Sequence, residues 1–324
     1  MKKTKFGIWR HENSIGNSAE HTIGLALYLK KNNINPSNVE VYVEHEWQKY
    51  LALCIEGVEE DNVKLFEHEV TLGNMDPYFD DIHMPIVYGA DAFKLSYECG
   101  WSYLEQQKDL DVVLKFDTQN YENKFNLPND AIVLFHREAG TWNKRVDGNN
   151  FEPERFVDPE AFHKLALYYA DLGYEVIKLG DKNQAPLPGK YNPFEFGAEH
   201  ENPNIYDFTK YLDEEGNPLW TLQDYLYVLQ NCKVFISCDA GIWPMAAAMG
   251  KNLVFCNVTS IFNPPQLMMH NQSPCLMIQK PEVINWLSAD TTQLLTKNFH
   301  VLEDKYVLRD NTLDEIVRAA KRFL

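Results

Sequence analysis

Short apolar segments alternate with amphipathic ones along much of the chain, and the stretch over 233–260 shows this alternation most clearly. Residues 234–237 (VFIS) form an apolar run with β-branched members, which is typical of a strand buried on both faces. A polar turn and a small-residue segment (WPMAAAM) follow, and Gly250 marks the end of the helix that this segment predicts. A second apolar run over 252–257 completes a strand–turn–helix–strand unit, the building block of a parallel sheet.

The rest of the pattern predicts further alternation of strands and helices. Strands are expected over 5–9, 39–43, 63–66, 111–116, 131–135, 174–179 and 276–279. Helices are expected over 18–31, 46–54, 101–107, 158–172, 221–230 and 311–324. The segments 71–97 and 183–216 have no clear periodicity, so we expect irregular structure there. We expect Asn311 to cap the last helix.

A polar segment over 120–130 separates two halves that each alternate strands with helices. We place a domain boundary there, with an N-terminal domain over 1–128 and a C-terminal domain over 129–324. The expected fold class is α/β, with two doubly wound, Rossmann-like domains that face each other across a cleft. The last helix could pack back on the N-terminal domain.

Composition and charge narrow the class of protein. The chain has 324 residues, of which 45% are hydrophobic and 13% aromatic, as is typical of a globular protein. The formal net charge of −17 argues against tight non-specific binding to nucleic acid, although a local basic patch is compatible with it. The sequence shows no signal-peptide pattern and no apolar run near the roughly 20 residues of a membrane-spanning helix.

Residue spacing gives little support for a metal or a cofactor. The six cysteines show no CxxC pair and no metal-ligand spacing, which favours free thiols in a reducing compartment. In the segment 71–97 a metal could be bound by Asp76, Asp80, Asp81 and His83. A solvated loop is the favoured interpretation of that segment. No P-loop, GxGxxG, GxSxG or HExxH motif is present. We therefore expect neither a metal nor a cofactor. The free thiols and the lack of a signal-peptide or membrane-span pattern lead us to expect a soluble, cytoplasmic protein.

The first candidate cluster lies between the first expected strand and the helix after it. Gly16 and Asn17 fall in the turn between them, where a ligand can approach the backbone closely. Glu20 and His21 follow in the first helical turn, and either side chain could take the proton of an acceptor hydroxyl. The alternative is that Asn17 or Ser18 caps the helix and that Glu20 only complements the helix dipole.

The second candidate cluster lies in the sequence FHREAGTWNKR, directly after a strongly apolar strand. His136 stands at the strand end, and Arg137, Lys144 and Arg145 form a positive group in an otherwise acidic protein. Arginine binds phosphate oxygens through two parallel hydrogen bonds, and positive charge stabilises a diphosphate leaving group. The alternative is that these cations form surface ion pairs with nearby carboxylates.

The third candidate cluster lies at the ends of two other expected strands of the C-terminal half. A turn with Asp239 and Gly241 precedes a helix, whose first N–H groups are free to bind an anion, while glycine allows close approach. The alternative is that Asp239 only caps that helix. The residues assigned to nucleotide-sugar binding at this edge are Asp239, Ala240, Gly241, Trp243, Gly180 and Asp181. For Gly180 and Asp181 a plain turn is the alternative.

These segments resemble the donor-binding half of GT-B glycosyltransferases, especially the lipopolysaccharide heptosyltransferase group. The features are a KLGD turn, a helix followed by a strand, and an Asp-x-Gly turn before an alanine-rich helix. In that family a D-[ST]-G-x-x-H-x-A-A-A pattern contacts the nucleotide sugar, which implies the same role for Asp239 and Gly241. Ala240 stands where the family has Ser or Thr, and Pro244 stands where it has His.

The resemblance bears on two further positions. The segment that begins with His136 is similar to the H-x-R strand end of several inverting glycosyltransferases, which implies that Arg137 contacts the diphosphate. The family's proposed base is an aspartate before the first helix, and Asn17 stands at the matching position here. Because an amide does not accept a proton usefully, either Glu20 or His21 has taken this role or the catalytic logic differs.

The favoured function is an inverting, metal-independent glycosyltransferase that moves a hexosyl or pentosyl group from a nucleotide sugar to a hydroxyl acceptor, such as a glycan or a lipid-linked saccharide. Three alternatives stay open. They are an epimerase or hydrolase of sugar nucleotides on the same scaffold, a non-catalytic nucleotide-sugar-binding protein, and a glycosyltransferase acting on modified DNA bases. The departures at Asn17 and Pro244 motivate the non-catalytic alternative, and the net charge weighs against DNA.

Overall fold

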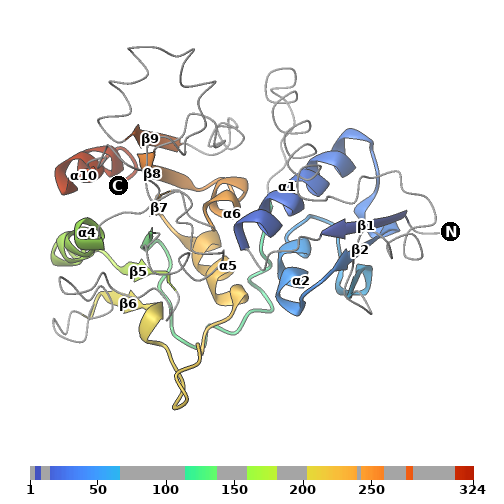
Figure 1. Ribbon diagram of the computed structural model, residues 1–324, viewed down its shortest axis with the longest axis horizontal. Helices are drawn as coiled ribbons and strands as arrows, with labels where there is room; N and C mark the ends of the chain where they lie inside the picture. Colours follow the sequence, from blue (N-terminus) through green and yellow to red (C-terminus); the bar gives the residue numbers. More distant parts are fainter. Residues whose placement is uncertain are drawn as a thin grey trace, which may run out of the picture.

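A computed structural model of the chain describes residues 4–8, 15–65, 114–136, 159–180, 203–238, 242–258, 275–279 and 311–324. Within these residues the strands form two separate sheets, with the orders β1-β2-β3 and β6-β5-β4-β7-β8-β9 (Figure 1). Neighbouring strands in both sheets run parallel. Parallel strands linked through helices confirm the α/β class that the hydrophobic pattern predicts.

The N-terminal elements build the three-stranded sheet. Val39, Val41 and Val43 of its central strand are 0% exposed, while the residues between them are partly exposed. This alternation follows from the two-residue period of a strand, which turns successive side chains to opposite faces. The elements are β1 (Thr4–Ile8), α1 (Ile15–Lys31), the 3₁₀ helix η1 (Pro36–Asn38), β2 (Val39–Val43), α2 (Glu46–Ala52), the 3₁₀ helix η2 (Glu60–Asn62) and β3 (Val63–Leu65).

The elements from β4 onward build the six-stranded sheet. Its central strands β4 and β7 are buried on both faces, which accounts for their continuous apolar runs. The elements are β4 (Ile132–Phe135), α4 (Pro159–Asp171), β5 (Val176–Lys178), β6 (Ile205–Asp207), the 3₁₀ helix η6 (Phe208–Lys210), α5 (Leu222–Asn231), β7 (Val234–Ser237), α6 (Trp243–Ala248), β8 (Asn252–Val258), β9 (Cys275–Gln279) and α10 (Leu313–Ala320).

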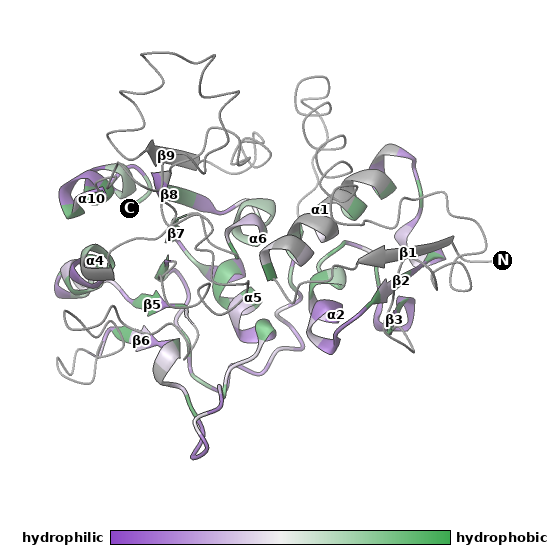
Figure 2. Cartoon of the chain, viewed as in Figure 1, coloured by the Kyte–Doolittle hydropathy of each residue, from purple (hydrophilic) through white to green (hydrophobic). Residues whose placement is uncertain are grey.

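Helices cover the two faces of the six-stranded sheet. On one face α4 packs against α10, and both carry purple and green residues in Figure 2, as expected of amphipathic helices on a sheet. On the other face α5 and α6 share a core with Val133, Ile177 and Phe235. The last helix, for which the sequence left open a return to the N-terminal half, packs on β8, β9 and α4.

The two halves of the chain meet through helices. Helix α1 of the first half packs against α6, and α2 contacts α5 (Figure 1). One apolar core continues across this contact and includes Ala19 and Leu25 of α1 as well as Trp243 and Met245 of α6. Because burial of this shared surface stabilises both halves, the two sheets are held in one arrangement.

The backbone over 114–116 is bonded to both halves in turn. The N–H of Leu114 donates to the carbonyl of Ala248 at 2.9 Å, and the next N–H, of Lys115, donates to the carbonyl of Cys54 at 2.9 Å. The third N–H, of Phe116, donates to the side-chain oxygen of Gln230 at 3.0 Å. The expectation of a strand over 111–116 is wrong for the described residues 114–116, because their N–H groups bond to helix ends and a side chain rather than to a neighbouring strand.

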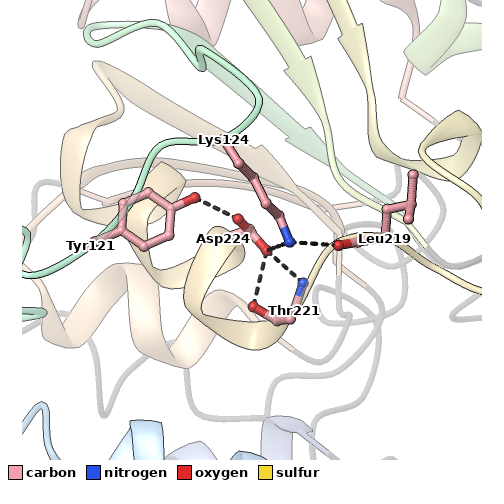
Figure 3. Close-up of polar contacts among 5 residues, drawn as sticks. All are labelled: Tyr121, Lys124, Leu219, Thr221 and Asp224. Atoms are coloured by element: carbon pink, nitrogen blue, oxygen red, sulfur yellow. Dashed lines mark hydrogen bonds and ion pairs between the residues drawn. The ribbon is translucent and has the colours of Figure 1, made fainter.

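The polar segment expected as a linker is fastened to α5 through a buried carboxylate (Figure 3). Asp224 accepts hydrogen bonds from the N–H and the hydroxyl of Thr221 at 2.6 and 2.9 Å, which completes a capping box at the start of α5. The Tyr121 hydroxyl donates to the other oxygen of this carboxylate at 2.5 Å. Lys124 Nζ lies 3.8 Å from the carboxylate and donates to the carbonyl of Leu219 at 2.7 Å.

The start of the first helix differs from the expectation. Helix α1 begins at Ile15, so Gly16 and Asn17 lie within its first turn rather than in the preceding loop, and neither Asn17 nor Ser18 caps the helix. The physical reason is a buried polar contact, in which Gln48 Nε2 of α2 donates to the Ser18 hydroxyl at 3.1 Å. Ser18 therefore lies inside the helix, where its hydroxyl bonds to α2, and not at the position of a cap.

Two further expectations are corrected in the C-terminal half. Strand β6 lies in the segment 183–216, where we expected irregular structure; three residues are too few to show a period. Helix α10 is capped by Thr312, whose hydroxyl accepts the N–H of Glu315, and not by Asn311. Asn311 instead exchanges two hydrogen bonds of 2.6 Å with the buried Asn257, which fastens α10 to the end of β8.

Removing the hydroxyl of Tyr121 should weaken the attachment of the linker to α5. We expect Tyr121→Phe to lower the free energy of unfolding by about 1.5–3 kcal/mol, because it removes a hydrogen bond to a buried carboxylate. Tyr227→Phe is a matched control, since its ring stacks on Tyr121 at 4.4 Å and its hydroxyl bonds, among the described residues, to the neutral amides of Asn123 and Asn129. Its expected cost is about 0.5–1.5 kcal/mol. Urea unfolding measures both, and an equal or smaller loss for Tyr121→Phe would contradict the prediction.

Candidate functional site

The strand order of the six-stranded sheet places a topological switch point between β4 and β7. From β4 the chain adds β5 and β6 on one side, and it then adds β7, β8 and β9 on the other side. In open α/β sheets, ligands bind outside the carboxyl ends of the strands at such a point. His136 and Cys238 stand at this edge, each one residue beyond the paired Phe135 and Ser237.

Two of the predicted binding segments leave the sheet at this switch point. The segment 137–145 follows β4 in the sequence, and the segment 239–241 lies between β7 and α6. Because β4 and β7 are parallel neighbours, both segments start from the same edge. The predicted site residues that lie outside the described part of the chain are Arg137, Lys144, Arg145, Asp181, Asp239, Ala240 and Gly241.

His136 is buried at the end of β4. Its side chain is 1% exposed, and its ring lies 4.9 Å from the ring of Phe162 in α4. Burial lowers the pKa of His136 well below its ordinary value, and the positive charge of Lys178 lowers that pKa further. A neutral imidazole at this edge carries one hydrogen-bond donor and one acceptor.

Gly180 stands at the end of β5, and a tyrosine occupies both of its backbone polar groups. Its N–H donates to the hydroxyl of Tyr225 at 2.9 Å, and its carbonyl accepts from the same hydroxyl at 2.8 Å. Tyr225 belongs to α5 and stacks on Trp220, with the ring centroids 4.6 Å apart. These bonds fix the backbone conformation just after β5. The N–H and carbonyl of Gly180 are therefore bonded within the protein.

Trp243, the first residue of α6, lies in the core. It is 6% exposed, and its ring centroid is 5.0 Å from that of Phe255 in β8. The side chain therefore holds the start of α6 against the sheet. Direct contact of Trp243 with a nucleotide sugar stays a prediction.

The other predicted residues lie on α1. Gly16 is buried in the first turn of this helix, and Asn17, Glu20 and His21 follow in its first two turns. The side chains of these last three residues lie outside the described part. Since α1 packs against α6 and its N-terminal end is turned toward that helix in Figure 1, the fold brings the predicted base region toward the switch point of the other sheet.

Lys178 and Tyr225 lie near this edge of the sheet, and the sequence analysis did not assign either of them to the candidate site. Lys178 is 0% exposed at the end of β5. Its signal was a lysine inside an apolar strand, where the pattern favours continuous apolar residues. Tyr225 gave no comparable signal, because a tyrosine on the apolar side of an amphipathic helix is ordinary core composition.

The described residues carry free thiols and no metal-type cluster. Cys54, Cys232, Cys238 and Cys256 are buried and free, and burial raises the pKa of Cys232 to about 12. No three His, Cys, Asp or Glu side chains of the described part are grouped so that they could hold a metal ion. A helix long and apolar enough to cross a membrane is not found among the described residues either.

Two solved structures are similar to this chain along nearly its whole length. The glycosyl transferase family 9 protein of Veillonella parvula is 14% identical, with a TM-score of 0.51 over 100% of this chain and 98% of that one. The ADP-heptose LPS heptosyltransferase II of E. coli is also 14% identical, with a TM-score of 0.52 over 99% of this chain and 98% of that one. No protein-family model matches the sequence, and no curated protein matches it significantly. The similarity confirms the GT-B fold that the resemblance implied.

The buried His136 should make stability depend on pH. Because its pKa is lowered in the folded state, the unfolded chain binds more protons below about pH 6.5, and stability falls as the pH falls through that value. We expect His136→Gln to remove up to about 1.4 kcal/mol per pH unit from this slope between about pH 6.5 and 5. Urea unfolding at several pH values measures the slope. Above about pH 8 the two curves should be parallel, and parallel curves down to about pH 5 would refute the assignment.

Proposed function

We propose that this protein is a glycosyltransferase, which moves a sugar from a nucleotide-sugar donor to a hydroxyl acceptor. The observation that carries the proposal is the switch point between β4 and β7, where the arginine-containing segment 137–145 and the turn over 239–241 both leave the sheet. A nucleotide sugar requires positive charge for its diphosphate and polar groups for its sugar, and these segments carry both. The fold shared with two glycosyltransferases supports the same function.

On the donor side, Arg137 binds the diphosphate, with Lys144 or Arg145 as a second cation. Their positive charge stabilises the negative charge that develops on the leaving nucleoside diphosphate. Asp239 and the backbone at Gly241 bind the sugar or its phosphate. In this proposal cationic side chains carry the role that a metal ion has in other transferases, so the reaction is metal-independent.

On the acceptor side, Glu20 or His21 of α1 acts as the base. It takes the proton of the acceptor hydroxyl while that oxygen bonds to the anomeric carbon and the bond from this carbon to the diphosphate breaks. A single displacement of this kind inverts the anomeric configuration. The packing of α1 against α6 supports the assignment, because it turns the start of α1 toward the edge where the donor binds.

The assay combines donor binding with product analysis. Thermal shift with ADP-, GDP-, UDP-, CMP- and dTDP-sugars, with and without magnesium, identifies the donor, since a ligand that binds the native state raises the melting temperature. ADP-heptose belongs in this panel because the E. coli structure is that of an ADP-heptose transferase. Reactions with and without glycan acceptors then separate transfer from epimerisation or hydrolysis, which need no acceptor. Donor turnover that is independent of every acceptor would contradict the proposal.

Substitutions should test separately the residue that binds the diphosphate and the residue that acts as the base. We expect Arg137→Ala to lower kcat by about 100-fold or more, because it removes charge that stabilises the transition state. Either Glu20→Gln or His21→Asn should lower kcat by about 10²–10⁴-fold, whichever residue is the base. Arg318→Ala and Glu46→Gln are matched controls at exposed positions of α10 and α2 and should leave kcat unchanged. Full activity of Arg137→Ala, or of both base variants, in the transfer assay would refute the corresponding assignment.

A further inference from the structure

A carboxylate oxygen without a hydrogen bond stands at the end of the central strand of the first sheet. Glu44 directly follows β2, its side chain is 19% exposed, and its Oε2 atom is shielded from solvent. No group in the described part of the chain donates a hydrogen bond to Oε2, and His45 Nε2 lies 3.9 Å away, beyond hydrogen-bond distance. A shielded carboxylate oxygen without a donor costs free energy, which is typical of a group that a ligand completes.

Glu44 lies at the edge of its sheet where a ligand is expected. Open α/β sheets bind ligands outside the carboxyl ends of their strands, and Glu44 comes directly after such an end. Gln48 of α2 fixes the backbone there, because its Oε1 accepts the N–H of Glu44 at 2.8 Å and that of His45 at 3.0 Å. Its Nε2 donates to the hydroxyl of Ser18 at 3.1 Å. One side chain thus connects the end of β2 to α1, the helix that is proposed to carry the base.

Two rings adjoin this carboxylate. Those of His45 and Trp47 stack, with their centroids 6.0 Å apart and their planes at 14°, and the imidazole side chain is 37% exposed. Flat rings pack against the C–H groups of a sugar, and a carboxylate accepts hydrogen bonds from its hydroxyl groups. An ionised carboxylate donates no hydrogen bond and repels anions, so the end of β2 favours an uncharged, hydroxyl-rich ligand.

We propose that Glu44 binds the acceptor, and that this acceptor is a neutral saccharide whose hydroxyl groups donate to the carboxylate. The inference rests on the proposed function, because it assigns the acceptor of that reaction. Rotation about the terminal torsion of glutamate, which is broad, turns either oxygen toward the saccharide. The formal net charge of −17 adds to the selection, since it repels phosphorylated or carboxylated saccharides at long range.

The test compares neutral and anionic acceptors in the transfer assay. The probes are the methyl glycosides of the common neutral sugars, each paired with its phosphorylated form. The wild type should use its best neutral glycoside with a kcat/KM at least about tenfold above that of the phosphorylated form. For Glu44→Gln we expect the KM of this glycoside to rise about tenfold, because hydrogen bonds to an amide are weaker than those to a carboxylate. Donor affinity, measured by calorimetry, should stay within about twofold, since the donor is proposed to bind the other sheet.

Glu40→Gln is the matched control. Glu40 lies near the other end of the same strand, and its carboxylate accepts a hydrogen bond from the hydroxyl of Tyr42 at 3.1 Å. The substitution removes the same charge from the same strand, but away from the carboxyl end. We expect the KM of the neutral glycoside to stay unchanged, and a rise equal to that of Glu44→Gln would overturn the proposal.

The outcomes separate this inference from the proposed function. If Glu44→Gln keeps the wild-type KM, or if the wild type transfers sugar only to anionic or other acceptors, the inference fails and the proposed function stands. If the wild type binds no nucleotide sugar and transfers nothing, both fail. Circular dichroism checks that Glu44→Gln is folded. If it is not, Glu44→Asp decides, because it keeps the charge but withdraws the carboxylate by one methylene group; its KM should also rise, and a wild-type KM would overturn the inference.

Discussion

Three consecutive backbone N–H groups join the two halves of this protein. Those of Leu114 and Phe116 bond to α6 and α5, while that of Lys115 between them bonds to the backbone at Cys54, after α2. Successive N–H groups of an extended chain point in opposite directions, so one short segment can be bonded on both sides. Buried N–H groups are costly to leave unpaired, and separating the halves would expose or orphan these donors. The relative position of the two sheets is therefore specified by the backbone as well as by apolar packing.

This constraint matters for the proposed chemistry, because the reacting groups come from both halves. The proposed base lies on α1 and the donor segments start from the second sheet, so transfer depends on how α1 sits against α6. An enzyme that holds the acceptor and the donor in the geometry required for reaction removes the need for a rare encounter in solution. This effect can account for a large part of a rate enhancement. The carboxylate of Asp224 extends the same constraint, since it fastens the connecting segment through Tyr121 to the start of α5. The segment 114–116 and the polar segment expected as a linker, which both lack regular secondary structure, thus help to determine how the two halves are arranged.

The sequence predicted the regular elements well and the polar contacts poorly. Strands β2 and β7 have the predicted bounds, because β2 alternates apolar and polar residues and β7 is a continuous apolar run with β-branched members. The start of α1 was wrong, because it depends on Ser18 bonding to Gln48, which lies thirty positions further along the chain. The cap of α10 was wrong for the same reason, since Asn311 pairs with Asn257. Hydrophobic periodicity is a local signal, whereas partners of buried polar groups are set by the folded chain.

In the candidate site, too, the sequence predicted what depends on neighbouring residues and did not predict what depends on contacts between distant segments. The sequence predicted that His136 and the segment after it follow a buried strand. It also predicted that residues 239–241 follow a second one, because each segment comes directly after an apolar run. That β4 and β7 are neighbours, with β5 and β6 to one side, was not readable, since strand order depends on contacts between distant segments. This order alone turns two separate motifs into parts of one edge.

The charge of the protein adds a physical requirement to that edge. A chain with a formal net charge of −17 repels an anion at long range, so the donor binding that we propose requires positive charge close to the phosphates. Solvent-exposed cations supply such charge only weakly, because salt and water screen them. The proposed donor site therefore requires several cations that act together, and the sequence places Arg137, Lys144 and Arg145 directly after β4 for this role.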